Sequence, residues 1–111
     1  MQELNSRQEC DAAFGRESSI IFKHSTQCPI SANARREMES FTSGGEPVPV
    51  YMLDVNERRE LSDYVAERTG IEHQSPQVVL LRGGDPAWHA SRFDITARTL
   101  RDQLGLATQA G

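Results

Sequence analysis

One cysteine at the start of a helix pattern is the residue of this chain best placed to do chemistry. It stands in the stretch Phe22–Ser31 (FKHSTQCPIS), where an apolar run ends and a helix pattern begins. Proline is favoured in the first helical position and keeps the residue before it out of the α region, so Pro29 predicts that Cys28 is the N-cap. An N-cap side chain faces free backbone amides of the next turn, which here belong to Ile30 and Ser31. Those amides and the positive end of the helix dipole favour a thiolate over a thiol.

Such a cysteine acts as a nucleophile at neutral pH, because its pKa falls from about 8.5 into a range of roughly 3.5 to 7.5. Lys23 and His24 lie just upstream and are expected to help stabilise the thiolate, while Thr26 and Ser31 supply hydroxyls. Two other interpretations stay open at this point. Cys28 could be a small inert cysteine that begins a helix, and His24 could be an ordinary solvated side chain.

The elements predicted around this cysteine alternate between strands and helices. Ser6 and Glu9 have the spacing of a capping box, which predicts a first helix after them. Strands are predicted at 19–23, 48–55, 77–81 and 86–90, and further helices begin at Cys28, at Asn56 and at Asp94 or Thr96. Since Pro49 cannot donate a ladder hydrogen bond, its strand should begin unpaired or lie at an edge.

The order of these elements predicts an α/β fold of the thioredoxin type. The first two strands should be parallel because a helix connects them, and Gly83-Gly84 predicts a hairpin between the last two. We therefore expect a four-stranded mixed sheet flanked by helices, with an extra N-terminal helix, in the order α-βαβα-ββ-α. With 111 residues, the chain is expected to form a single domain over 1–111.

Three motifs in this order resemble the monothiol bacilliredoxin family of thioredoxin-like proteins (YtxJ type): FKHSTQCPIS, EHQSPQVVLL and AWHASRFDIT. The resemblance covers nearly the whole chain. It implies a thioredoxin-type fold and thiol–disulfide exchange with bacillithiol, a low-molecular-weight thiol of some bacteria. It also implies a cis bond between Ser75 and Pro76 that faces the cysteine, leaving the Ser75 backbone open to an extended substrate. Thr26, Ser75 and Pro76 are thus expected to bind substrate, although Pro76 could instead be a turn proline that starts a strand.

The resemblance also implies a function. Two-cysteine relatives carry CxxC, but Ser31 stands where the second cysteine would be, and a hydroxyl cannot resolve a mixed disulfide. We expect a monothiol oxidoreductase that removes bacillithiol from S-bacillithiolated client proteins, with bacillithiol as co-substrate, no tightly bound cofactor, and a bacillithiol disulfide reductase acting indirectly. Ser31 either hydrogen-bonds the thiolate or merely completes the first helical turn.

Two other functions fit the same residues. A glutaredoxin-like iron–sulfur carrier or scaffold would need one cysteine per chain, and a thioredoxin-like interaction module would need no reactive cysteine at all. A metal site built from Cys28, His24, His73 and His89 is not expected, because their spacing matches no standard zinc site.

The rest of the composition excludes several classes. A formal net charge of -4 with scattered basic residues argues against nucleic acid, and no run of about 20 apolar residues argues against a membrane. The N-terminus lacks a basic start and an apolar centre, so a cytoplasmic location is expected, where a disulfide between Cys10 and Cys28 would not form.

Cys10 shares a helix face with Ala13 and Phe14 and is expected in the core, a resolving or regulatory role being the alternative. The tail 107–111 is expected to fray.

Overall fold

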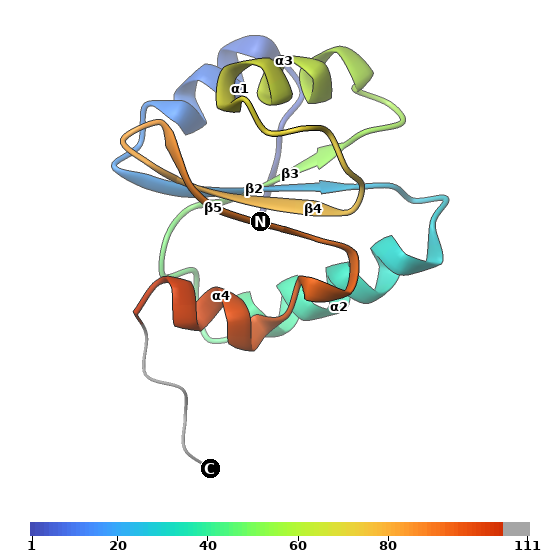
Figure 1. The fold of residues 1–111 in the computed structure, drawn as a ribbon, viewed down its shortest axis with the longest axis vertical. Helices are drawn as coiled ribbons and strands as arrows, with labels where there is room; N and C mark the ends of the chain where they lie inside the picture. Colours follow the sequence, from blue (N-terminus) through green and yellow to red (C-terminus); the bar gives the residue numbers. More distant parts are fainter. Residues whose placement is uncertain (106–111) are drawn as a thin grey trace.

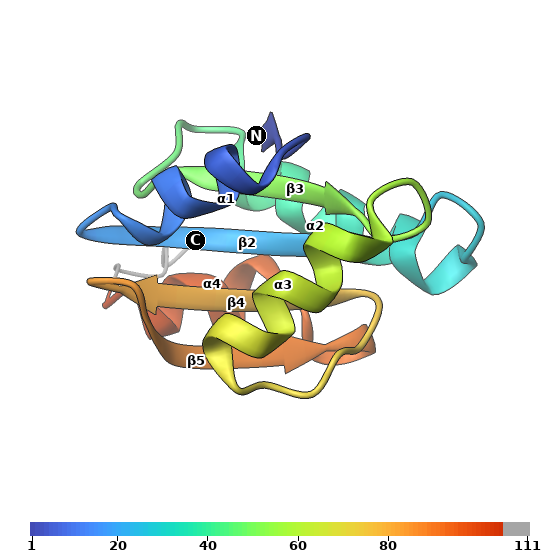
Figure 2. The ribbon, with the colours of Figure 1, turned by 90° about the horizontal axis from the view of Figure 1, so that it is seen from above.

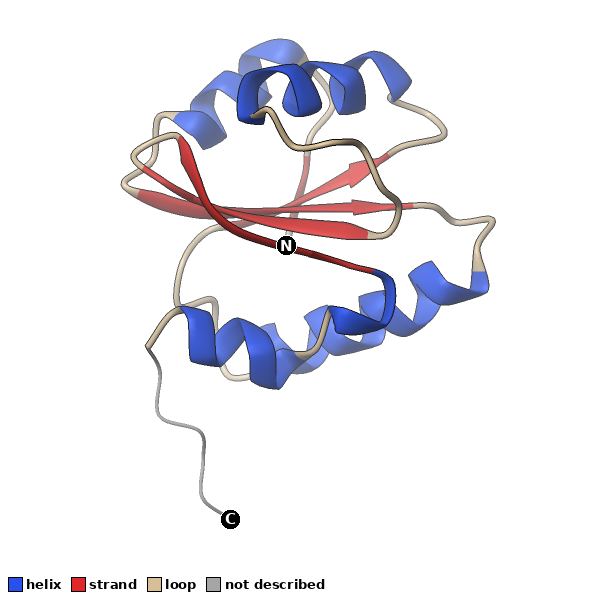
Figure 3. Cartoon of the chain, in the orientation of Figure 1, coloured by secondary structure: helices blue, strands red, loops and turns tan. Residues whose placement is uncertain are grey.

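A mixed β-sheet lies between two layers of helices (Figures 1 and 3). The computed structural model describes residues 1–105, so the predicted fraying of 107–111 falls outside the described residues. In chain order the elements are β1 (Gln2–Glu3), α1 (Arg7–Phe14), β2 (Ser18–His24), α2 (Pro29–Thr42), β3 (Val50–Asp54), α3 (Arg59–Thr69), β4 (Gln77–Arg82), β5 (Asp85–Ser91), the 3-10 turn η1 (Arg92–Asp94) and α4 (Ala97–Gln103). The thioredoxin-like α/β prediction is confirmed.

The sheet has the strand order β1-β3-β2-β4-β5 and places β2 at its centre. β2 and β3 are parallel, as predicted, whereas β4 runs antiparallel to β2 and to β5. Viewed from above, α1 and α3 lie across the strands (Figure 2). Because successive side chains of a strand point to opposite faces, Ile20 and Phe22 pack towards α2 and α4, while Ile21 packs towards α1 and α3.

The strand predictions need two corrections. The sheet has five strands instead of four, because Gln2 and Glu3 pair in parallel with Tyr51 and Met52 of β3. Two residues are too few for a periodic pattern to show. For the same reason β3 is not an edge strand over that pair, although it does begin only after Pro49, as the missing N–H of that residue predicts.

The helix starts agree with the sequence in part. The Ser6 hydroxyl accepts from the Glu9 amide at 3.1 Å, but the Glu9 carboxylate bonds the amide of Asn5 instead of that of Ser6. Thr96, and not Asp94, caps α4. Asn56 does not cap a helix, since α3 begins at Arg59.

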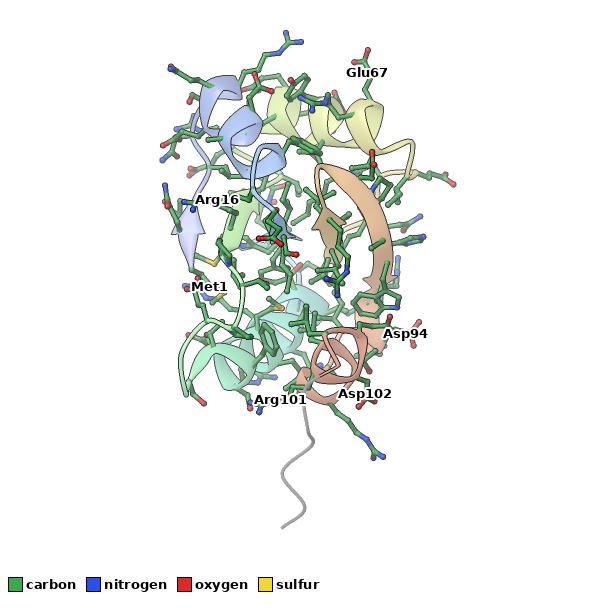
Figure 4. The ribbon with its side chains drawn as sticks, turned by 90° about the vertical axis from the view of Figure 1, so that its left-hand side faces the viewer. Met1, Arg16, Glu67, Asp94, Arg101 and Asp102 are labelled. Atoms are coloured by element: carbon green, nitrogen blue, oxygen red, sulfur yellow. The ribbon has the colours of Figure 1, made fainter. Side chains whose placement is uncertain are left out.

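The chain segments around Cys28 meet at one edge of the sheet, formed by the ends of its strands. β2 and β3 end there, β4 begins there and β5 ends there in η1, as the right-hand side of Figure 1 shows. The helix α2 starts at this edge, directly after β2. Ligands of open α/β sheets bind at the carboxyl ends of parallel strands. Figure 4, turned to look from the left-hand side of Figure 1, shows the same layers, with Asp94 of η1 at the outer margin.

The hairpin between β4 and β5 lies at the opposite edge. Gly83 and Gly84 have φ values of 60° and 84°, which glycine adopts without strain. A Cβ at Gly84 would approach the carbonyl oxygen of Phe14 to 2.8 Å, so this turn also fits closely against the end of α1. No helix within residues 1–105 is long and apolar enough to cross a membrane.

Candidate active site

Cys28 is the N-cap of α2 and is partly exposed. Its backbone is extended, with φ −117° and ψ 122°, and Pro29 occupies the first helical turn. The Cys28 carbonyl accepts the first helical hydrogen bond, from the amide of Ala32 at 3.2 Å. The predicted position of Cys28 is therefore confirmed.

The backbone amides of Ser31 and Ile30 lower the pKa of the Cys28 thiol, in that order of size, and the Ser31 hydroxyl adds to them. Among the described residues the sulfur makes no side-chain cap hydrogen bond of standard geometry. The amides therefore act as N–H dipoles near the sulfur and not as a closed cap. The result is a thiol whose ionised form is favoured where solvent reaches it.

Ser31 serves both the loop and the sulfur. Its side chain is buried, and its Oγ accepts a hydrogen bond from the Ser25 amide at 3.1 Å. Because this bond uses a lone pair, the hydroxyl proton is left free to donate towards Cys28. The two roles predicted as alternatives for Ser31 are therefore compatible.

The loop between β2 and α2 is held by side chains from two elements. Ser25 Oγ accepts from the Gln27 amide at 3.2 Å and from Asn56 Nδ2 at 2.7 Å. Asn56 thus stabilises the loop before the cysteine instead of capping α3. The Asp54 carboxylate accepts hydrogen bonds from the amides of Asn56 and Glu57, and the turn that results comes before the start of α3. The sequence gives no sign of this contact because 31 positions separate the two residues.

Ser75 and Pro76 lie at the same sheet edge as Cys28, directly before β4. Their peptide bond is cis, as the resemblance implied. Pro76 is buried, and its carbonyl accepts from the amide of Arg92 at 3.0 Å, which joins this loop to η1. Thr26 is exposed in the loop that leads to α2, two residues before Cys28.

Arg92 belongs to this site but was missed by sequence reasoning. It is exposed, and its positive charge also lowers the pKa of the Cys28 thiol. The motif AWHASRFDIT contained it, yet nothing in the spacing linked it to a cysteine so far away in the chain. The antiparallel pairing of β4 and β5 brings it there.

Comparison with known proteins agrees with this geometry. The family model of the monothiol bacilliredoxin BrxC matches residues 2–100. The chain belongs to the monothiol bacilliredoxin family.

Solved structures add the fold and the reaction class. One, provisionally described as an oxidoreductase with a thioredoxin fold, is 31% identical with a TM-score of 0.86 and covers 93% of this chain and 92% of its own. Thioredoxin from Trypanosoma brucei brucei (TM-score 0.76, 15% identity, 93% and 86% covered) and oxidised mitochondrial thioredoxin 3 from Saccharomyces cerevisiae (0.74, 13%, 95% and 93%) share the fold. Family and fold together identify this bacilliredoxin as a thiol oxidoreductase.

Two residues expected to stabilise the thiolate, Lys23 and His24, are not among the groups that lower the pKa of Cys28. Lys23 lies on the α3 side of the sheet, where its ammonium donates to the Ser62 carbonyl at 3.3 Å and sits 3.3 Å from His73 Nδ1. His24 is buried on the opposite face, stacked on Phe22, and burial lowers its pKa, so the ring is neutral at neutral pH. Strand alternation separates Lys23 from His24, because neighbouring residues of a strand point to opposite faces.

The histidines of this bacilliredoxin lie apart. His24 is buried towards α2, His73 contacts Lys23 and Ser62 beside α3, and His89 is exposed on β5. Within residues 1–105 no group of three histidine, cysteine, aspartate or glutamate side chains could hold a metal ion.

Cys10 lies in the core between α1, α3 and the sheet, with no exposed surface. Burial raises the pKa of its thiol to about 11, with Asp11 and Glu9 adding to the effect. The prediction of a core cysteine is confirmed, and Cys28 is the cysteine that solvent can reach.

Proposed function

We propose that this bacilliredoxin removes bacillithiol from mixed disulfides with client proteins, in the cytoplasm. The observation that carries the proposal is the combination at the start of α2: a partly exposed Cys28 with a lowered pKa, and Ser31 where a resolving cysteine would stand. A thiolate attacks disulfides, and a site with one thiol depends on a small thiol to complete the cycle.

The reaction balances in two exchanges. The Cys28 thiolate attacks the bacillithiol sulfur of the mixed disulfide, the old S–S bond breaks, and the client leaves as a thiolate that takes a proton from water. A second bacillithiol, as its thiolate, then attacks the bacillithiol sulfur held on Cys28. Cys28 leaves as a thiolate and bacillithiol disulfide is released, so one disulfide bond replaces another: one incoming bacillithiol thiol is consumed and one client thiol is set free. A bacillithiol disulfide reductase would regenerate the small thiol.

The neighbouring backbone supports a place for the client. The Ser75–Pro76 loop lies outside the strand ladder, since β4 begins only at Gln77. An extended client segment could pair with the Ser75 backbone as an added strand, and the exposed Thr26 in the loop before Cys28 could contact it as well. This arrangement would align the client's disulfide along the α2 N-terminus.

Intact mass spectrometry can test this function. The reduced protein is mixed with a client protein carrying one S-bacillithiol group, and each species is weighed after acid quenching. The wild type should take up one bacillithiol adduct while the client loses it, and added bacillithiol should remove the adduct.

Cys28→Ser should take up none, and Cys10→Ser is the matched control that should react like the wild type, because Cys10 is buried. An adduct that persists in Cys28→Ser, or a wild type that leaves the client unchanged, contradicts the proposal.

A further inference from the structure

Arg92 has an unusual backbone for its residue type. Its φ is 56°, and it is the one non-glycine residue with positive φ among residues 1–105. Such conformations are uncommon for residues with a side chain, and they concentrate at functional sites. A glycine would adopt this conformation freely, so the long charged side chain is not there to suit the turn.

The position of Arg92 is fixed relative to the Ser75–Pro76 loop. Its amide donates to the Pro76 carbonyl at 3.0 Å, directly after the pairing of Ser91 with Gln77. The turn η1 that it begins packs against α2, the helix that Cys28 caps. Arg92 therefore borders the space that a disulfide bound between the loop and the sulfur would fill.

The guanidinium has no partner of its own within the described part of the chain. The ion pairs found there join Met1 to Glu46 and Arg68 to Asp11, and no side-chain hydrogen bond involves Arg92. The nearest acidic residue in sequence, Asp94, points outward at the margin of the molecule (Figure 4). An exposed arginine without a carboxylate partner is available to a ligand.

Both the start of α2 and Arg92 favour negative charge at the sulfur. The first turn of α2 contains no acidic residue, and its amides carry the positive end of the helix dipole. Helix N-termini favour anions, and arginine presents a planar fork that fits a carboxylate. Two separate elements, a helix end and a side chain from η1, thus favour negative charge in one place.

We propose that Arg92 determines the specificity of this site by binding a carboxylate of the small thiol that is joined to Cys28 during exchange. This inference deepens the proposed function and rests on it for the identity of the thiol, but the charge preference itself can be tested without bacillithiol. Arg92 would select carboxylate-bearing thiols and disfavour those with an amine at the same distance from the sulfur.

Three symmetric disulfides of similar size provide the test: 3,3′-dithiodipropionate, bis(2-hydroxyethyl) disulfide and cystamine, which are anionic, neutral and cationic. The second-order rate of adduct formation on reduced protein is measured by quenched intact mass, at a pH where Cys28 is fully ionised in every variant. Since the intrinsic reactivities of the disulfides differ, each rate is divided by the wild-type rate with the same disulfide.

Arg92→Gln removes the charge, Arg92→Lys keeps it, and Arg92→Gly suits the left-handed backbone, so that at least one neutral variant folds without strain. Arg98→Gln is the matched control, because Arg98 is also an exposed arginine, on α4. We expect both neutral variants to react roughly tenfold more slowly with the anionic disulfide, with little change for the neutral one and an equal or faster rate with cystamine. Arg92→Lys should lose less rate with the anionic disulfide than the neutral variants do, and Arg98→Gln should lose none. Added salt should reduce the difference in rate between the wild type and Arg92→Gln with the anionic disulfide.

An equal loss of rate with all three disulfides in Arg92→Gln and Arg92→Gly would overturn the proposal, since it would mean that Arg92 acts only on the fold or on the thiolate. Unchanged rates would overturn it as well. Failure of the proposed function looks different: the neutral Arg92 variants would still lose rate with the anionic disulfide alone, while the wild type leaves bacillithiol on the client protein.

Discussion

The exposed start of α2 and the core between the sheet, α1 and α3 have opposite effects on the pKa values of ionisable groups. At the start of α2, Cys28 is partly exposed and its pKa is lowered by the amides of Ser31 and Ile30. On the α1 and α3 side, burial raises the pKa of the Cys10 thiol to about 11 and lowers that of the Lys23 ammonium to about 8. The exposed start of α2 favours the charged form of its thiol, and the core favours the neutral forms of Cys10 and Lys23.

The difference shows that placement, and not residue type, decides which cysteine is reactive. Cys10 lies within a helix whose amides are already bonded, and no solvent reaches it. Cys28 lies just before a helix whose first amides lack partners in the helix. Desolvation opposes charge in the first case, and oriented dipoles favour it in the second.

The alkylation rates of Cys28 and Cys10 test this difference most directly. At about pH 7 a thiol with a pKa near 11 is ionised to roughly one part in ten thousand, so Cys28, whose pKa is lowered, should react with iodoacetamide at least about a hundredfold faster than Cys10. Peptide mass spectrometry at successive times gives both rates in one sample. In strong denaturant the two rates should converge. Comparable rates in the native protein would mean that Cys10 is not enclosed.

Lys23 tests the buried side, and it is the only lysine of the chain. Its side chain is 1% exposed, and its pKa is lowered to about 8 by burial, with Asp63 acting against the shift. Between pH 8 and the ordinary value of 10.5 the unfolded chain binds a proton at Lys23 that the folded chain does not, so this group should raise stability with pH, by up to about 3 kcal/mol. The raised pKa of Cys10 acts in the opposite direction between pH 9 and 11, so all proteins are compared in a Cys10→Ala background. Below pH 8 both states bind the proton, and the destabilisation is fully present.

Urea unfolding across this pH range checks the prediction. Lys23→Met should remove most of the rise and make the protein more stable at pH 7, because an apolar side chain of similar length replaces an ammonium without a carboxylate partner. Arg59→Met, on the exposed surface of α3, is the control and should keep the rise. A Lys23→Met protein with the wild-type pH profile would show that Lys23 is not the group responsible.

A variant of Ser31 tests the exposed region at the start of α2. Ser31→Ala removes the hydroxyl but keeps the backbone amide, which is the largest cause of the lowered pKa of Cys28. We expect the pKa to rise while staying below its ordinary value, and the rate of disulfide exchange below that pKa to fall by roughly fivefold, as for loss of one hydrogen bond. A titration of thiolate absorbance measures the pKa. Ser40→Ala, far along α2 and exposed, should change neither quantity.

The sequence predicted the parts of this site that depend on local chain order. Pro29 after Cys28 specifies an N-cap without tertiary information, and apolar runs specify the central strands. The contacts that complete the site are long-range. Asn56 reaches Ser25 across a turn, and Arg92 reaches the Pro76 carbonyl through the pairing of two strands.

The errors have the same origin. Lys23 and His24 were expected to act together on the sulfur because both precede it, but their strand turns one towards α3 and the other towards α2. Strand β1 was missed because two residues gain their structure only from β3 beside them. Tertiary pairing decides both cases, and a local pattern contains no record of it.

The smallest expected effect concerns stability at the reactive position itself. Cys28 makes no side-chain cap bond, so an aspartate there could accept from the amides of Ile30 and Ser31 and complement the helix dipole. Cys28→Asp should therefore abolish exchange but raise the melting temperature, by roughly 2–6 °C. Thr26→Asp places the same charge two residues earlier, outside the cap, and should give a smaller rise. A Cys28→Asp protein that melts below the wild type would show that the amides of Ile30 and Ser31 are not free to stabilise an anion. A protein that melts above it would show that the wild type leaves these amides without a hydrogen-bond acceptor, with a measurable loss of stability.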